Sequence, residues 1–254
     1  VYRILPSPHF LIKDSKILLE DSEKIDSIAN IKNLKVFINQ NNFFYKDNEK
    51  IKKVIINQAN FSLKKDTIKL LNESSNNKFS NKKIKINNSN IFFKDSSDET
   101  ISIVKIYKSE LYFDDKKLLN LFNLKGEIFK VPFSFNLKNT TDTLKNRKIN
   151  ISAKSLNLNI FDNATEIKKD STSGENVISF LNSKINTKYT VKEKLINFES
   201  GISKIKNSEI NYKGQIVTNP FDLNLNVDLN DYKLSKLKKA ILILIEIART
   251  ELLF

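Results

Sequence analysis

The sequence predicts a mainly β protein: an elongated, curved, mostly antiparallel sheet of repeated hairpins, groove-like in form, with a few packing helices. Three observations predict this fold. Apolar and polar residues alternate in many segments, polar turn-like stretches separate those segments, and one hairpin-like segment recurs later in the chain. Alternation with a period of two places the apolar side chains of a strand on one face.

The two clearest strands are residues 131–137 and 221–229. Their odd-numbered positions are apolar, and the positions between them are polar or proline. The apolar positions are Val131, Phe133, Phe135, Leu137, Phe221, Leu223, Leu225, Val227 and Leu229. Each strand therefore presents one apolar face, formed by these nine residues.

Between residues 149 and 160 the alternation shifts by one residue near Lys154 and Ser155. A bulge or a bend between two short strands would produce this shift. Residues 18–31 and 175–182 are predicted as helices. The C-terminal segment is also predicted as a helix because apolar residues recur there at spacings of three and four.

One longer similarity joins two parts of the chain. Residues 123–137 read NLKGEIFKVPFSFNL and residues 211–225 read NYKGQIVTNPFDLNL, with a glycine and a proline at matching positions. A shorter pattern of the same kind occurs four times, beginning at Gln58, Asn88, Lys108 and Asn207. Each copy is typical of a glycine-bearing strand, a turn and a second alternating strand. Accidental similarity between hairpins of biased composition is the alternative.

Two segments follow from this organisation: residues 1–232 form the repeated hairpin region, and residues 233–254 form an amphipathic helix that starts the next segment of a longer chain. The sequence begins at valine and contains no methionine. We therefore expect a fragment of a larger protein.

The formal net charge is +14, but the lysines are spread along the chain in short clusters. This distribution favours a solvated surface over a specific nucleic-acid interface. The chain has no cysteine, so disulfides and thiolate metal sites are excluded. No apolar run reaches the roughly 18 residues of a spanning helix.

Residues suited to covalent chemistry are scarce. His9 is the sole histidine, and the four glycines are dispersed. A catalytic triad, the usual zinc sets and a glycine-rich phosphate loop are therefore not expected. We expect His9 to be an ordinary edge residue, and we expect no enzyme activity, no catalytic or metal site and no cofactor.

Three features carry a family resemblance: an extended Pro-x-Pro start that leads into alternating strands (residues 5–19), the repeated units with glycine and proline, and a helix after the sheet (residues 233–254). In these features the chain resembles the AsmA-like family of bacterial envelope proteins, which includes TamB and YhdP relatives. The resemblance implies a periplasmic sheet, anchored in the inner membrane by a helix that this fragment lacks. It also implies a partner, phospholipid or another acyl-chain lipid, and a role in lipid transport between the membranes or in outer-membrane biogenesis. The nine apolar residues of 131–137 and 221–229 would then be the lining of a lipid-binding groove.

Other interpretations of the apolar faces and of the positive charge stay open. The same apolar faces could form the dry core of a closed sandwich, because alternation does not separate a packed face from a groove. A cell-surface structural or adhesive protein with a protein partner fits that arrangement. A third hypothesis is that the chain is a module that binds a polyanion through its positive charge.

Overall fold

The computed structural model describes residues 1–3, 7–21, 24–39, 51–64, 78–140, 145–168, 171–206 and 208–229. Sixteen strands account for most of them, and the sole helical element among them is a 3-10 turn, Lys154–Leu156. The chain divides into two compact units, Val1–Thr141 and Asp142–Phe254, called unit 1 and unit 2. The prediction of a mainly β, mostly antiparallel fold built from hairpins is confirmed.

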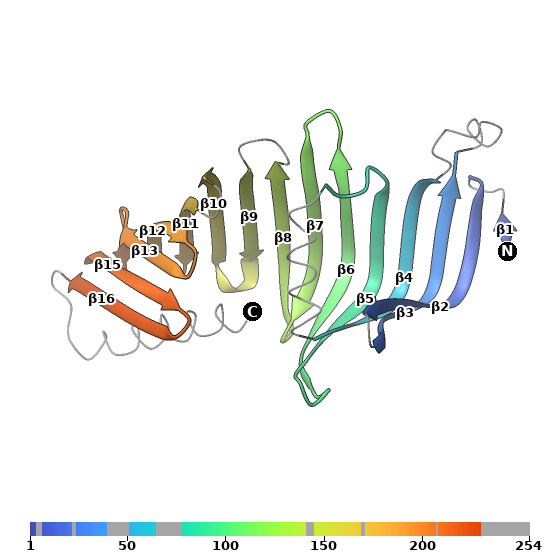
Figure 1. Ribbon diagram of the computed structural model, residues 1–254, viewed down its shortest axis with the longest axis horizontal. Coiled ribbons are helices and arrows are strands. Elements are labelled where there is room, and N and C mark those ends of the chain that lie inside the picture. Colours follow the sequence, from blue (N-terminus) through green and yellow to red (C-terminus); the bar gives the residue numbers. More distant parts are fainter. Residues whose placement is uncertain are drawn as a thin grey trace. The chain divides into compact units, whose positions relative to one another are not determined.

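Unit 1 contains eight strands, and β2 to β8 lie side by side in chain order (Figure 1). They are β1 (Tyr2–Arg3), β2 (His9–Asp21), β3 (Lys24–Ile38), β4 (Ile51–Leu63), β5 (Lys83–Lys94), β6 (Thr100–Asp114), β7 (Leu119–Ile128) and β8 (Val131–Thr140). Neighbouring strands pair antiparallel, except β4 and β5, which pair parallel.

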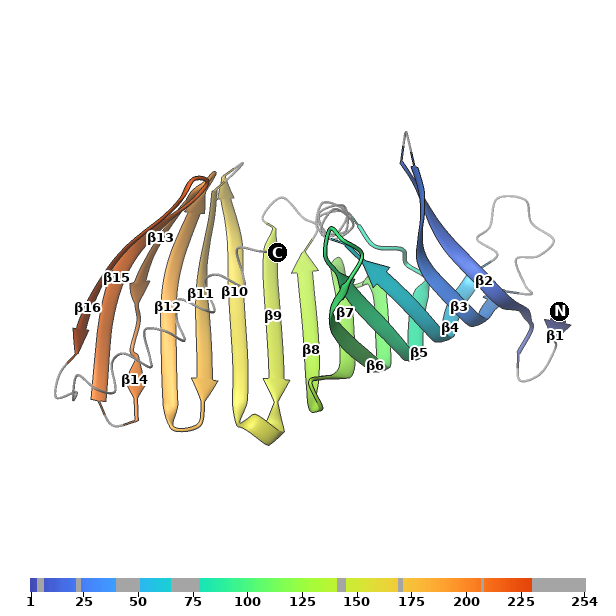
Figure 2. The ribbon, with the colours of Figure 1, turned by 90° about the horizontal axis from the view of Figure 1, so that it is seen from below.

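Unit 2 contains the other eight strands, which Figure 2 shows as neighbours in one layer. They are β9 (Asn146–Ala153), β10 (Leu158–Lys168), β11 (Ser171–Phe180), β12 (Ser183–Lys192), β13 (Leu195–Ser200), β14 (Lys204–Ile205), β15 (Ser208–Thr218) and β16 (Phe221–Leu229). The short β14 pairs with β12 and β15, and β13 also pairs with β15.

Two helix predictions are wrong. Residues 18–31 belong to β2 and β3, apart from residues 22 and 23, and residues 175–180 belong to β11. Ile28 and Ile31 are three residues apart, as on a helix face, but in β3 the β2–β3 ladder skips Ile28 at a bulge, whereas Ile31 is in register with Ser15. Pairing of Ile31 with Ala59 of β4 buries both residues, and this burial outweighs the local pattern. The predicted helix at residues 233–254 lies outside the described residues.

The two copies of the longer similarity are both hairpins, β7–β8 and β15–β16, but their registers differ. Gly126 lies opposite Phe133, and residues 129–130 form the turn. Gly214 lies opposite Leu225, and residues 219–220 form the turn. The proline therefore lies inside β8 in the first copy and in the turn in the second. The predicted bend near Lys154 is confirmed, because the 3-10 turn joins β9 to β10.

A line of irregular positions crosses β2 to β5. Asp14, Gln58 and Asn88 have positive φ angles of 49°, 57° and 47°. The ladders skip Asp14, Lys32, Gln58 and Asn88, and the paired residues on either side place these four positions next to one another across β2 to β5. At each position the alternation of side chains slips by one residue, as it does at a β-bulge. This line is called the bulge line.

The core of unit 1 lies next to the bulge line on one face of the sheet. Ala29, Ile31, Ile56 and Ala59 are at most 7% exposed and pack together. Leu34, Val54, Phe61, Ile84 and Ile86 surround them. The other face carries mainly lysine and asparagine, as the slipped alternation of these strands requires.

Candidate functional site

The predicted groove residues of β16 share one face of unit 2. Leu223, Leu225 and Val227 are half-buried and lie opposite Ile216, Gly214 and Tyr212 of β15. Phe221, at the start of the strand, is 52% exposed. Leu229 lies opposite Ile210, and its side chain is outside the described part.

Neighbouring strands extend this surface, which we call the apolar face of unit 2. Val191, Ile196, Ile216 and Leu223 lie directly opposite one another on β12, β13, β15 and β16. A second row joins Ile151, Ile160, Ile178 and Ile185 on β9 to β12. The predicted face of one strand is therefore part of an apolar surface that extends over most of the unit.

A polar row separates these two apolar rows: it contains Asp162, Asn176, Thr187 and Ser200. The Tyr189 hydroxyl donates to Asp162 Oδ1 at 2.7 Å, and Arg147 lies 3.5 Å from the other carboxylate oxygen. Burial, and then the hydrogen bond to Asp162, raise the pKa of Tyr189 well above its ordinary value. The polar row is thus partly satisfied from within the face.

Tyr212 bridges the polar row from β15. Its hydroxyl lies 2.6 Å from Thr187 Oγ1 and donates to the Asn186 carbonyl at 3.1 Å. Burial raises the pKa of Tyr212. Both tyrosines place their rings among apolar residues and direct their hydroxyls to polar partners, as buried tyrosines usually do.

The predicted groove residues of β8 lie in a more closed setting. Val131, Phe133, Phe135 and Leu137 are half-buried and lie opposite Ile128, Gly126, Leu124 and Phe122 of β7. The Phe135 and Phe122 rings are 5.5 Å apart, and Leu124 is 7% exposed. This face continues the core face of unit 1 through β6, where Val104 and Ile106 are buried.

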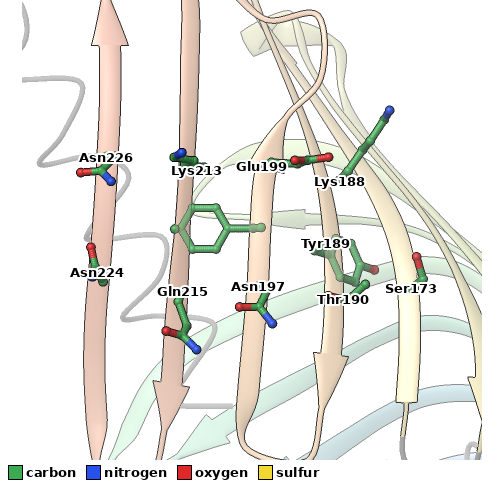
Figure 3. Close-up of a pocket in the computed structure, with 12 residues that line it drawn as sticks. Ser173, Lys188, Tyr189, Thr190, Asn197, Glu199, Lys213, Gln215, Asn224 and Asn226 are labelled. Atoms are coloured by element: carbon green, nitrogen blue, oxygen red, sulfur yellow. The ribbon is translucent and has the colours of Figure 1, made fainter.

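The opposite face of unit 2 carries a shallow cavity of about 550 Å³. A neutral row crosses it, with directly opposed side chains on β11, β12, β13, β15 and β16: Ser173, Thr190, Asn197, Gln215 and Asn224. Figure 3 shows the amides of this row on neighbouring strands. None of the five side chains hydrogen-bonds to another described residue.

A charged row runs beside the neutral row. Lys188, Glu199 and Lys213 lie directly opposite one another on β12, β13 and β15, and Asn226 follows on β16. Opposite charges thus alternate across the strands, which stabilises the pairing slightly. The cavity has hydrogen-bond donors and acceptors, and its one carboxylate, Glu199, lies between its two lysines.

The sequence pattern gives no direct signal for this cavity. Asn224 and Asn226 stand out in the sequence merely as the polar partners of an alternating strand. Their alignment with Gln215 and Lys213 depends on the register of the β15–β16 pair. That register is not encoded in any single segment.

His9, predicted as an ordinary edge residue, begins β2 next to the short strand β1 and is buried. It is 3% exposed, its Nδ1 donates to the Ser7 carbonyl at 2.7 Å, and its ring stacks on Phe37 at 4.9 Å. Among the described residues, no group of three histidine, cysteine or acidic side chains is placed to hold a metal ion. In the same part of the chain, no helix is both long and apolar enough to span a bilayer.

Comparison with protein-family models finds no match to this chain, and comparison with curated proteins finds none either.

Proposed function

We propose that unit 2 binds the acyl chains of a phospholipid on its apolar face, and that the chain conducts lipid between the inner and outer membranes of a bacterial envelope or supports outer-membrane assembly. The row of Val191, Ile196, Ile216 and Leu223 carries the proposal. Its four strands span about 14 Å at about 4.8 Å per strand. Each methylene buried there contributes about 0.8 kcal/mol.

The arrangement of the layer supports the same proposal. All described strands of unit 2 belong to one sheet, so within those residues no second sheet packs on the apolar face. Phe180 and Phe221, at opposite ends of this face, are 44% and 52% exposed. Large exposed apolar side chains next to a half-buried apolar row are typical of a surface that binds an apolar partner.

Native mass spectrometry with lipid extraction tests the proposal on protein purified in mild detergent from a bacterial envelope. The test variant is Leu223→Asp/Leu225→Asp. The control, Asn224→Asp/Asn226→Asp, adds the same charge to the opposite face of the same strand. We expect phospholipid with the wild type and the control, and none with the folded test variant. Equal retention in all three proteins would contradict lipid binding on this face.

A second measurement covers the case in which the test variant unfolds. A phospholipid with a photoreactive group in the middle of its acyl chain is incubated with the wild-type protein and irradiated. We expect cross-links in peptides from β13, β15 and β16. Cross-links confined to unit 1, or their complete absence, would contradict the proposal.

A structural role is the second candidate, and the core of unit 1 favours it. Ala29 and Ala59 are 1% and 0% exposed, as in a dry, packed interior. Under this alternative the faces of β8 and β16 are packing surfaces and the partner is another protein. A lipid-free wild type, together with unfolding of both Phe133→Asp and Leu225→Asp, would favour it over lipid binding.

A further inference from the structure

The polar face of unit 1 carries a cavity of about 510 Å³ at the bulge line. Its lining includes Lys16, Asn30, Asn60 and Asn90, which lie opposite or beside one another on β2 to β5. Lys32, Gln58 and Asn88 of the bulge line complete this side of the cavity. The bulges turn the strands here, which hollows an otherwise flat polar face.

The asparagines form hydrogen-bonded ladders with a fixed direction. Asn90 Nδ2 donates to Asn60 Oδ1 at 3.0 Å, and Asn87 Nδ2 donates to Asn57 Oδ1 at 3.0 Å. The acceptors on β4 therefore keep their own amide N–H groups, which no other described residue accepts. The hydrogen bond that Asn60 Oδ1 accepts polarises its amide group, which strengthens the remaining N–H donor.

Lysine side chains line the cavity together with these amide donors. Lys16 and Lys32 are exposed, and neither forms an ion pair with a described residue. Asp14 is the single carboxylate among the lining residues. Two ammonium groups outnumber the one carboxylate in this lining, and together with the amide donors they favour an anion over a cation.

We propose that this cavity binds a phosphate-class oxyanion, with Lys16 and Lys32 as its charged contacts and the amide of Asn60 as a neutral donor. A phosphate group offers several acceptor oxygens and negative charge, which complement ammonium and amide donors. The group could belong to a soluble phosphate or to a lipid headgroup. The site does not depend on lipid binding by unit 2, because it lies on the other unit.

The test is a titration with inorganic phosphate at constant ionic strength, followed through the amide NMR signals of Asn30, Asn60 and Asn90. The test variant is Lys16→Gln/Lys32→Gln. The control, Lys108→Gln/Lys125→Gln, removes the same charge from a directly opposed pair on the same face, outside the cavity. We expect saturable shifts in the wild type and the control, and a loss of affinity of about tenfold or more in the test variant.

Two results would overturn the site: no saturable shift in the wild type, or an equal loss in both variants, which would mean diffuse charge attraction. Flotation with phosphatidylcholine vesicles, with and without phosphatidic acid, then distinguishes the sources of phosphate. Binding to phosphatidic acid that is lost with Lys16→Gln/Lys32→Gln supports a lipid headgroup. Phosphate binding without vesicle binding supports a soluble phosphorylated ligand.

Discussion

Tyr189 lies directly opposite Gly174 across the β11–β12 ladder, and its ring occupies the space in which a Cβ of residue 174 would lie. Phe198 and Gly214 repeat this relationship across β13 and β15. A glycine in a strand loses conformational freedom without providing a side chain to pack. An aromatic ring on the opposite residue covers the bare backbone and recovers buried area. Two of the four glycines therefore make room for aromatic rings on the apolar face of unit 2.

We expect Gly174→Ala to destabilise the protein by about 1–3 kcal/mol, because the new methyl group displaces the Tyr189 ring. Chemical denaturation of the wild type and the variant measures the change. In a Tyr189→Ala background the same substitution should cost little, since the ring is no longer there. An equal cost in both backgrounds would mean that Gly174 is required for its backbone rather than for the ring.

Tyr189→Phe should make the protein less sensitive to alkaline pH. The raised pKa means that the folded state keeps the hydroxyl proton after the unfolded state has lost it. The unfolded state then binds fewer protons, so stability falls as the pH rises above about 10. We expect a shallower fall for Tyr189→Phe in denaturation curves from pH 8 upward. Lysine titration affects both proteins equally, so parallel slopes would contradict this prediction.

At neutral pH, Tyr189→Phe should lower the free energy of unfolding. It removes the hydrogen bond to Asp162, which is 9% exposed, and hydrogen bonds to charged groups contribute about 1.5–3 kcal/mol. Arg147, at 3.5 Å, remains as a partner of the carboxylate. The variant should therefore be less stable at pH 7 and should approach the wild type in stability as the pH rises.

Ser89 and Ser109 test what a buried hydroxyl contributes. They are 2% and 1% exposed on neighbouring strands of unit 1. Ser89 Oγ accepts from the Ala59 amide at 3.0 Å and donates to the Asn87 carbonyl at 2.9 Å. Ser109 Oγ has no hydrogen-bond partner.

We therefore expect Ser89→Ala to cost about 1–3 kcal/mol, because it leaves a buried amide unsatisfied. Ser109→Ala should be neutral or stabilising, because it removes a hydroxyl that has already lost its hydration. Urea denaturation of the two variants makes the comparison at nearly equal burial. A larger loss for Ser109→Ala would contradict the assigned partners.

Strands with clear alternation could be predicted from the sequence because each carries its own signal. Alternation from Phe221 to Val227 defines a face whichever strand lies beside it, and that face is the one the structure shows. The helix predicted at residues 18–31 failed because β3 has apolar residues on both faces. Burial of Ile31 against Ala59 favours the strand, and Ala59 lies 28 positions further along the chain, outside the local pattern.

The candidate sites were less predictable because they depend on register. Gly126 and Gly214 occupy matching positions in similar sequences, yet one lies opposite Phe133 and the other opposite Leu225. Turn geometry fixes this difference. One usable signal was present: Asn30, Asn60 and Asn90 are evenly spaced in the sequence and adjacent in the sheet.

Strands β4 and β5 form the one parallel pair among the described strands, and asparagine side chains bridge them. Asn57 and Asn87 are half-buried and share a hydrogen bond of 3.0 Å. We expect Asn57→Ala and Asn87→Ala each to destabilise by about 0.5–1.5 kcal/mol, and the double variant to lose less than their sum. A double-mutant cycle from urea denaturation measures the coupling. Strict additivity would mean that the amides are solvated independently and that hydrophobic pairs such as Ile56 and Ile86 hold the two strands in register without help from the ladder.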